Sequence, residues 1–308
     1  MVQPSFHQRS DLKEIARRAM VDRGLQPDFA PPVKAELDRI TGAAPPAGQG
    51  IRDLRGLLWC SIDNDDSKDL DQLSVSESLP GGAVKILVAV ADVDAVVKKD
   101  MAIDQHARHN TTSVYTAAEI FPMLPPRLST DVTSLNEGED RLALVVELAV
   151  APDGSLDGSS VYRAAVKNRA QLAYDAVSAW IEGKAPAPEP VSRVAGLDEQ
   201  LRVQDAVAQK LRGLRFEQGA LDLETLQPKA IFDGETVVAL RQEPHNRARQ
   251  LIEDFMIAAN GVTARFLAER KFSSLRRVVR SPERWQRIVE VAKEQGEHLP
   301  PEPDSKAL

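Results

Sequence analysis

A chain of 308 residues, of which 43% are hydrophobic, can bury a substantial core, and we expect one compact body with an appendage. The single cysteine excludes an internal disulfide, while the lack of a signal-like run or of roughly 20 continuous apolar residues predicts a cytoplasmic protein with no membrane span. The net charge of −7 excludes a broadly basic surface that coats nucleic acid, so a polyanionic partner requires a local basic groove.

Two short helices and a linker are expected at the N-terminus. Apolar side chains repeat at helical spacing over residues 10–22, and a second helix is predicted for 33–41. The segment 41–50 is rich in Gly, Pro and Ala, which is typical of a linker. We therefore divide the chain into a helical N-terminal appendage with its linker, residues 1–50, and a main domain, residues 51–308.

The first half of the main domain carries strand patterns. Apolar runs or alternating apolar residues occur at 57–62, 72–77, 83–92, 141–150 and 160–166. Turn sequences at 80–82 (PGG) and 152–154 (PDG) join consecutive strand candidates, which is typical of hairpins rather than of parallel crossovers. These patterns predict an α+β fold, in which a mixed, largely antiparallel sheet is surrounded by helices.

Helical patterns dominate the second half. We expect helices at 170–182, at 196–213 and at 245–270, where apolar residues repeat at helical intervals. Ser281, Pro282 and Glu283 have the character of a cap and first turn of a last helix.

Basic residues fall into three groups that could line an anion-binding groove. Each group is also compatible with an ordinary solvated helix face. The groups are Arg163, Lys167 and Arg169; Arg241, Arg247 and Arg249; and the basic residues between 265 and 280.

An acidic cluster follows the first strand candidate. It contains Asp63, Asp65, Asp66, Asp69 and Asp71. Several carboxylates in one loop repel each other, and hard divalent cations such as Mg²⁺ offset that repulsion through oxygen ligands. Composition alone leaves three interpretations open, namely a solvated acidic loop, a calcium loop and a catalytic magnesium site.

The spacing argues against two other metal sites. An EF-hand loop counted from Asp63 needs Gly at its sixth position and Glu at its twelfth, and these positions hold Lys68 and Ser74. His106 and His109 could suggest zinc, but two histidines without a third ligand are more typical of surface or packing roles.

Several motifs in fixed order carry a family resemblance. Asp63, Asp69 and Asp71 have the spacing of an aspartate signature whose final position is Gln72 here. Further matches, in chain order, are Val90-Ala-Asp92, Thr112-Ser-Val-Tyr115, Phe121-Pro-Met-Leu-Pro125, Leu128-Ser129, Ser134-Leu135, Asp140-Arg-Leu-Ala143, Leu172-Ala-Tyr174, Gly219-Ala-Leu-Asp222 and the segment Leu251 to Asn260. Together they resemble the catalytic domain of the ribonuclease II (RNB) family over residues 52–290.

The resemblance implies a metal-dependent 3′ to 5′ exoribonuclease that hydrolyses single-stranded RNA to nucleoside 5′-monophosphates. It implies Mg²⁺ as the cofactor, with Mn²⁺ as a substitute, and no organic cofactor. It assigns catalytic and metal-binding roles to Asp63, Asp69 and Asp71, and RNA-binding roles to Tyr115, Tyr174 and Glu253. Asp71 would orient the attacking water or complete the metal shell, Tyr115 would stack on a base, and Tyr174 and Glu253 would touch the ribose.

The sequence departs from the family pattern in three places, and two of these departures, Gln72 and a missing arginine motif, favour an alternative function. Gln72 replaces the usual fourth aspartate, and residues 220–223 offer no second stacking aromatic. A Thr-Ser-Pro-Ile-Arg-Arg-like motif, whose arginine grips phosphate in the family, has no match after Arg280, so we expect a domain truncated at its C-terminal side. Because losing such an arginine can cost several kcal/mol of barrier, the alternative is a catalytically impaired module that still binds single-stranded RNA.

Overall fold

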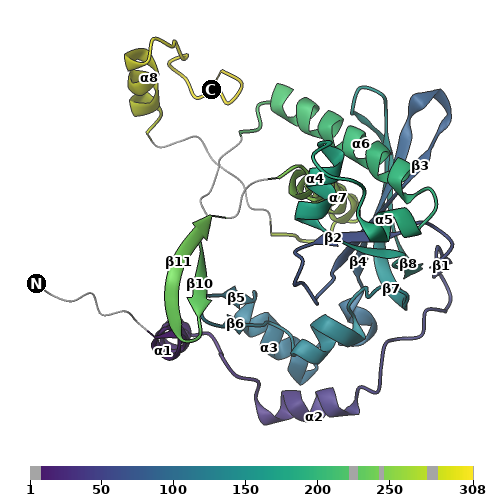
Figure 1. Ribbon diagram of the computed structural model, residues 1–308, viewed down its shortest axis with the longest axis vertical. Helices are drawn as coiled ribbons and strands as arrows, with labels where there is room; N and C mark the ends of the chain where they lie inside the picture. The colour runs from purple at the N-terminus through teal and green to yellow at the C-terminus, as the bar shows by residue number, and fades with distance from the viewer. Residues whose placement is uncertain (1–7, 222–227, 243–245, 276–283, 308) are drawn as a thin grey trace, which may run out of the picture.

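The computed structural model describes residues 8–221, 228–242, 246–275 and 284–307, and its centre is a seven-stranded sheet (Figure 1). The strand order is β1-β8-β7-β4-β3-β2-β9. Neighbours are antiparallel, except that β1 runs parallel to β8 and β2 parallel to β9. The strands are β1 (Arg52–Asp53), β2 (Cys60–Asp63), β3 (Gln72–Ser78), β4 (Val84–Ala91), β7 (Asp140–Val150), β8 (Leu156–Lys167) and β9 (Ala170–Ala173). The predicted α+β class and the largely antiparallel sheet are confirmed.

Both predicted hairpin turns are present. The short 3-10 helix Pro80–Gly82 joins β3 to β4, and residues 152–154 join β7 to β8. Gly154 has a φ of +89°, and a Cβ at this position would lie 2.7 Å from the carbonyl oxygen of Lys210. Glycine is therefore required there for both its backbone conformation and its lack of a side chain.

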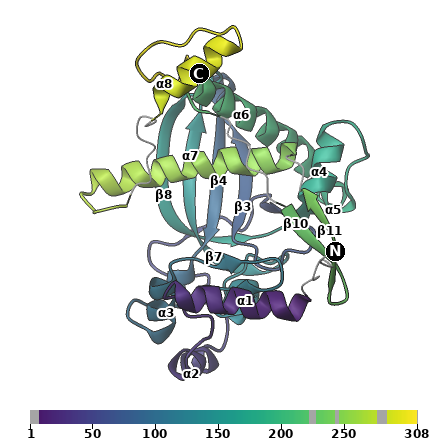
Figure 2. The same cartoon turned by 90° about the vertical axis from the view of Figure 1, so that its left-hand side faces the viewer.

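The side chains of β4 alternate between two hydrophobic cores, one on each face of the sheet. Ile86 and Val88 belong to the core that the helices cover, whereas Leu87 and Ala89 belong to the core that contains the buried Trp59. Figure 2 shows α7 lying across the strands on the helical side. The helices of this side are α4 (Tyr174–Ile181), α5 (Glu189–Arg193), α6 (Leu197–Glu217) and α7 (Arg247–Glu269).

The N-terminal helices, α3, two small hairpins and two short helical turns form a second group beside the sheet (Figure 1). A third core contains Val33, Ile103 and Leu128 and joins α2 to α3 and to a π-helical turn. The hairpin of β10 and β11 lies against α1, where the backbone N–H of Arg9 donates to the carbonyl oxygen of Glu235 (2.7 Å). The group comprises α1 (Arg9–Asp22), α2 (Pro31–Arg39), the 3-10 turn Val93–Ala95, α3 (Ala102–Asn110), β5 (Val114–Tyr115), β6 (Ile120–Phe121), the π-helical turn Leu128–Val132, β10 (Pro228–Asp233) and β11 (Thr236–Gln242).

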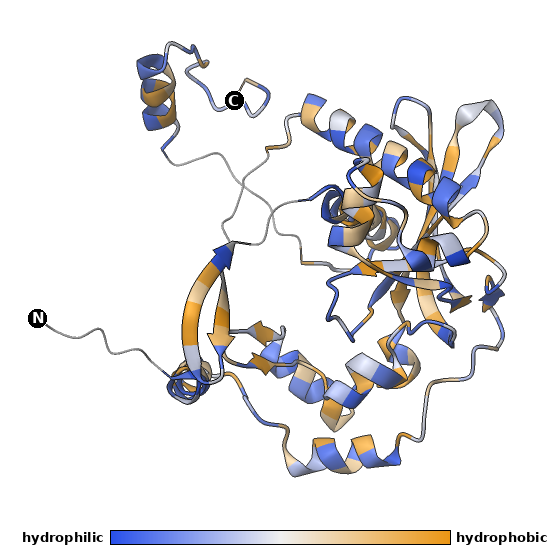
Figure 3. Ribbon diagram, in the orientation of Figure 1, coloured by the Kyte–Doolittle hydropathy of each residue, from blue (hydrophilic) through white to orange (hydrophobic). Residues whose placement is uncertain are grey.

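Much of the β10–β11 hairpin is coloured as hydrophobic in Figure 3. Val238 and Leu240 are two residues apart on β11, and their exposed fractions are 57% and 71%. The last helix, α8 (Trp285–Glu294), lies near the C-terminus, where the indole of Trp285 donates to the carbonyl oxygen of Pro300 (2.9 Å). Across the described residues, no helix is both long and apolar enough to span a membrane.

One predicted boundary was wrong. The helix expected at 170–182 begins only at Tyr174, because Ala170–Ala173 is strand β9. Ala170 and Leu172 are buried and Gln171 between them is exposed, and the segment pairs with β2 at the sheet edge. Strand pairing with a distant segment therefore overrides local helix propensity here. The expected start of the last helix at residues 281–283 lies outside the described residues.

Candidate active site

The acidic cluster lies in the loop that connects β2 to β3. Asp63 is the last residue of β2, and Asp71 directly precedes β3. The two strands pair at Cys60 and Ser74. Asp63 Oδ1 accepts hydrogen bonds from the backbone N–H of Asn64 (2.6 Å) and from Ser67 Oγ (3.0 Å), which gives the loop a tight first turn. Asp63 and Asp71 therefore lie at the same end of the sheet, where β2 ends and β3 begins.

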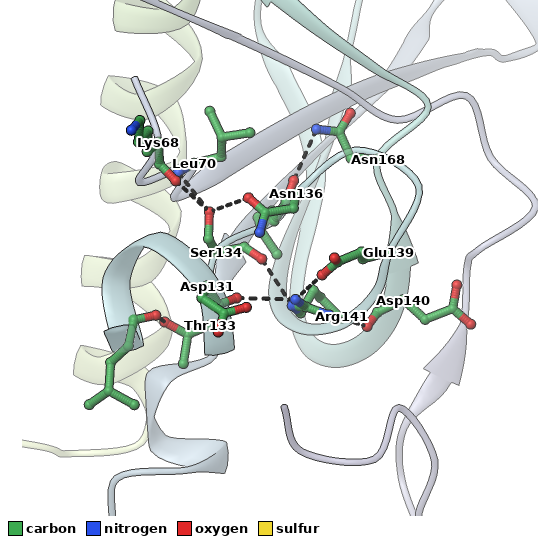
Figure 4. A network of polar contacts seen from close by, with 12 residues as sticks. Lys68, Leu70, Asp131, Thr133, Ser134, Asn136, Glu139, Asp140, Arg141 and Asn168 are labelled. Carbon is green, nitrogen blue, oxygen red and sulfur yellow. Dashed lines mark hydrogen bonds and ion pairs between the residues drawn. The ribbon is translucent and has the colours of Figure 1, made fainter. Parts of the chain in front are cut away.

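A polar network around Ser134 contacts the backbone of the acidic loop at Lys68 and Leu70 (Figure 4). Ser134 Oγ accepts from the backbone N–H of Leu70 (3.0 Å) and lies 3.1 Å from the carbonyl oxygen of Lys68. The guanidinium of Arg141 donates through Nε to the carbonyl oxygen of Ser134 (3.0 Å). Asn168 Nδ2 donates to the carbonyl oxygen of Leu135 (2.9 Å), which holds the segment against the sheet. The motifs around 134 and 140 thus hold the loop that carries the aspartates.

The loop forms one wall of a cavity of about 600 Å³. Asp63, Asp69 and Asp71 all line it, and so does Tyr115 from the opposite wall, where β5 and β6 lie. The Tyr115 side chain is 69% exposed, so an aromatic face is open to a ligand. Residues that are far apart in sequence are therefore brought to one cavity.

The electrostatics of the cavity are dominated by its carboxylates. Burial raises the pKa of Asp71 above its usual value, and the neighbouring charges of Asp63 and Asp69 raise it further. The pKa of Tyr115 is also raised, first by burial and then by the charges of Asp69, Asp71 and Asp63. Because the neighbouring negative charges disfavour the ionised form of Asp71, a bound cation would relieve the repulsion.

The carboxylate oxygens of the cavity are suitable ligands for a hard cation, although they do not form a complete coordination sphere by themselves. Within the described ranges, no three His, Cys, Asp or Glu side chains are arranged closely enough to hold a metal ion by themselves. Mg²⁺ usually keeps several water ligands and takes only one or two carboxylates together with substrate phosphates. Asp71, beside the like charges of Asp63 and Asp69, provides an oxygen ligand of this kind.

The two residues expected at the ribose differ in their placement. Tyr174 opens α4, and its pKa is raised to about 12, first by burial and then by the charge of Asp63, which places it beside the cluster. Glu253 is an exposed residue of α7, and it is not among the residues that line the cavity. Tyr174 is likewise absent from the cavity lining, and the structure joins it to the aspartates through electrostatics.

One residue of the site, Asn64, was not singled out by the sequence, and its partner Arg249 was named only as a member of a basic group. Asn64 accepts a hydrogen bond from Nη2 of Arg249 (2.6 Å), and the Arg249 guanidinium lies 4.7 Å from the ring centre of Tyr174. The position of Asn64 directly after Asp63 was the available signal. Asp66 lines the main cavity, whereas Asp65 lines a neighbouring one of about 390 Å³.

Two members of the first basic group, Arg163 and Lys167, are engaged in ion pairs. Arg163 contacts Asp92 (2.8 Å) and Asp94 (2.8 Å), and Lys167 lies 3.3 Å from Asp140. These contacts fit the interpretation of this first group as ordinary surface charge.

Residues 51–306 match the RNB domain family, and the chain belongs to this family. Ribonuclease R of Vibrio cholerae is 35% identical over 237 residues, which cover 77% of this chain and 28% of that protein. The inactive exonuclease DIS3L2 of Arabidopsis thaliana is 32% identical over 264 residues, 81% of this chain and 25% of that protein. The fold resembles that of Mycoplasma genitalium RNase R in complex with ribose-methylated single-stranded RNA, with a TM-score of 0.82 at 24% identity, over 93% of this chain and 45% of that one. The chain thus spans less than a third of the length of each of these two curated relatives.

Proposed function

We propose that this chain is the nuclease domain of a 3′ to 5′ exoribonuclease that hydrolyses single-stranded RNA to nucleoside 5′-monophosphates. The observation that carries the proposal is the cavity in which Asp63, Asp69 and Asp71 face the exposed ring of Tyr115. Ribonuclease R relatives and the RNA-bound Mycoplasma structure support the same class of substrate.

Each residue has a role in this proposal. Asp63 and Asp69 hold Mg²⁺, for which Mn²⁺ can substitute, and Asp71 orients the attacking water or completes the metal shell. The bound ions would activate that water and neutralise charge at the phosphate. Tyr115 stacks on a base, an interaction that accepts any sequence because every base has an aromatic face. Tyr174 and Glu253 contact the ribose, whose 2′-OH separates RNA from DNA.

A cleavage assay tests the proposal. We expect a 5′-labelled single-stranded RNA to shorten progressively from its 3′ end in Mg²⁺, with nucleoside 5′-monophosphates as products, and to stay intact in EDTA. Asp71→Asn should abolish shortening. Asp65→Asn is the matched control, because it removes the same charge from the same loop but at a residue that lines the neighbouring cavity.

The second candidate is an RNA-binding module with impaired catalysis. It is favoured by Gln72, whose amide turns inward and donates to the carbonyl oxygen of Ile62 instead of supplying a fourth carboxylate. The Arabidopsis relative, which is 32% identical and named an inactive exonuclease, supports the loss of catalysis in this alternative. RNA that is bound by the wild-type chain but never shortened in Mg²⁺ or Mn²⁺ would establish this alternative and reject the nuclease.

A further inference from the structure

The first turn of α7 is fixed to its surroundings at several points. Asn246 caps the helix by accepting from the backbone N–H of Arg249 (2.9 Å), and its Nδ2 donates to Asp175 (2.8 Å) at the start of α4. Arg247 makes a two-pronged ion pair with Asp205 of α6, with distances of 2.8 and 2.7 Å. Side chains that project from this turn are therefore held in defined positions.

Arg249 projects from this turn to the acidic loop. Its Nη2 donates to Asn64 Oδ1 (2.6 Å), one residue after Asp63, and its guanidinium lies over the ring of Tyr174 at 4.7 Å. The charge of Arg249 lowers the pKa of Tyr174, whereas the charges of Asp63 and Asp71 raise it, so all three act on the same phenol. A half-buried cation is thus located at the border of the acidic cavity.

The cavity needs such a cation if it receives RNA. Four of its carboxylates, those of Asp63, Asp66, Asp69 and Asp71, repel an incoming phosphate. Arginine suits this place because its planar fork presents five N–H donors, so it can bind a phosphate oxygen while it keeps its bond to Asn64. Stacking on Tyr174 and the fixed helix turn reduce the side-chain entropy lost when a phosphate binds.

We infer that Arg249 binds a backbone phosphate of the RNA strand whose 3′-terminal nucleotide occupies the acidic cavity. This inference rests on the proposed function, because it requires RNA in that cavity. It adds a phosphate-binding residue from α7, on the side of the cavity where Tyr174 lies. The guanidinium of Arg247, two residues earlier, is paired with Asp205, so Arg247 has a structural role.

Salt-dependent RNA binding tests the inference. Binding of a fluorescent oligouridylate is measured by anisotropy in EDTA at several salt concentrations, so that neither cleavage nor metal contributes. Arg249→Gln should weaken binding roughly 10-fold, as expected for a lost charged hydrogen bond. It should also make the slope of log K against log salt shallower by about 0.7, the value for one phosphate contact on a single strand. Arg249→Lys keeps the charge and should retain the slope.

Arg265→Gln is the matched control, because it removes the same charge from the other end of the same helix. It should leave the slope unchanged. Thermal unfolding of each variant shows whether the fold is intact. An unchanged slope in Arg249→Gln, or an equal change in Arg265→Gln, would overturn the role of Arg249 while the proposed function stands. A wild-type chain that binds no RNA would reject both.

Discussion

Gln72 Nε2 donates a hydrogen bond to the carbonyl oxygen of Ile62 (3.0 Å) across the gap between β3 and β2. Gln72 follows Asp71, and Ile62 precedes Asp63, so this side chain ties together the two chain segments that carry the aspartates. With an exposed fraction of 6%, the amide belongs to the interior and not to the cavity wall. The family resemblance predicts a fourth carboxylate at position 72. In this chain the Gln72 side chain instead links β2 to β3 at the point where the two strands diverge.

Replacing Gln72 should destabilise the fold in a way that depends on the new side chain. Gln72→Leu leaves the carbonyl oxygen of Ile62 without this donor, which costs about 1–3 kcal/mol. Gln72→Glu has nearly the same shape, but it places a carboxylate oxygen against the carbonyl oxygen of Ile62 and adds a negative charge next to Asp71. We therefore expect Gln72→Glu to lower the free energy of unfolding by more than Gln72→Leu does. Urea unfolding in EDTA measures both. If Gln72→Glu were as stable as the wild type, the side chain would have to face the cavity, contrary to the structure.

Long periodic patterns were sufficient to predict most of the fold. The helix predicted at 245–270 is observed as Arg247–Glu269, and both hairpin turns of the sheet lie where their Gly and Pro residues indicate. The β10–β11 hairpin was not predicted, although Asp233-Gly234 between two strand-like segments is a recognisable turn signal. Strand β9 was misassigned because four residues cannot be distinguished from the start of a helix without knowledge of their partner strand.

The site was predictable only in part. The spacing of Asp63, Asp69 and Asp71 indicated a shared cavity, and the structure places all three there. The contact between Arg249 and Asn64 joins residues 185 positions apart, so no local pattern could reveal it. The inward turn of Gln72 likewise depends on how two strands diverge, which is a property of the folded sheet.

Metal binding should stabilise the chain through its aspartates. Because burial and neighbouring charges raise the pKa of Asp71, its ionised form is unfavourable in the folded protein without a cation. Asp71→Asn should therefore be more stable than the wild type in EDTA. In Mg²⁺ at 100 times its Kd, the wild type should gain about 2.7 kcal/mol, and the variant should gain less. Thermal unfolding with and without Mg²⁺ checks this, and equal gains for both proteins would remove Asp71 from the metal site.

Tyr115 should contribute to RNA binding but not to stability. Tyr115 as a residue is 69% exposed, so Tyr115→Ala should change the free energy of unfolding by no more than about 0.5 kcal/mol. Loss of one stacked base should weaken single-stranded RNA binding by about 1–3 kcal/mol. Tyr115→Phe retains the aromatic face and should bind as the wild type does. Anisotropy titrations in EDTA provide the measurement, and unchanged binding by Tyr115→Ala would exclude stacking at this residue.

The stability of the chain should decrease in mild acid because of His106. This buried side chain of α3 contacts Gln26 through Nδ1 (3.1 Å), and its ring lies 4.6 Å from that of Phe29, so it attaches the segment after α1 to α3. Burial lowers the pKa of His106, and the positive charge of His109 lowers it further. Folding therefore favours the neutral ring.

The direction of the pH effect follows from that lowered pKa. Stability from His106 is fully present above the unfolded-state pKa of about 6.5. It falls as the pH drops below that value, because the unfolded chain then binds a proton that the folded chain resists. Urea unfolding between pH 8 and pH 5.5 should show this decrease, and His106→Gln, which cannot titrate, should flatten it. A profile of the same slope in His106→Gln would assign the effect to another group, with His109→Gln as the next variant to compare.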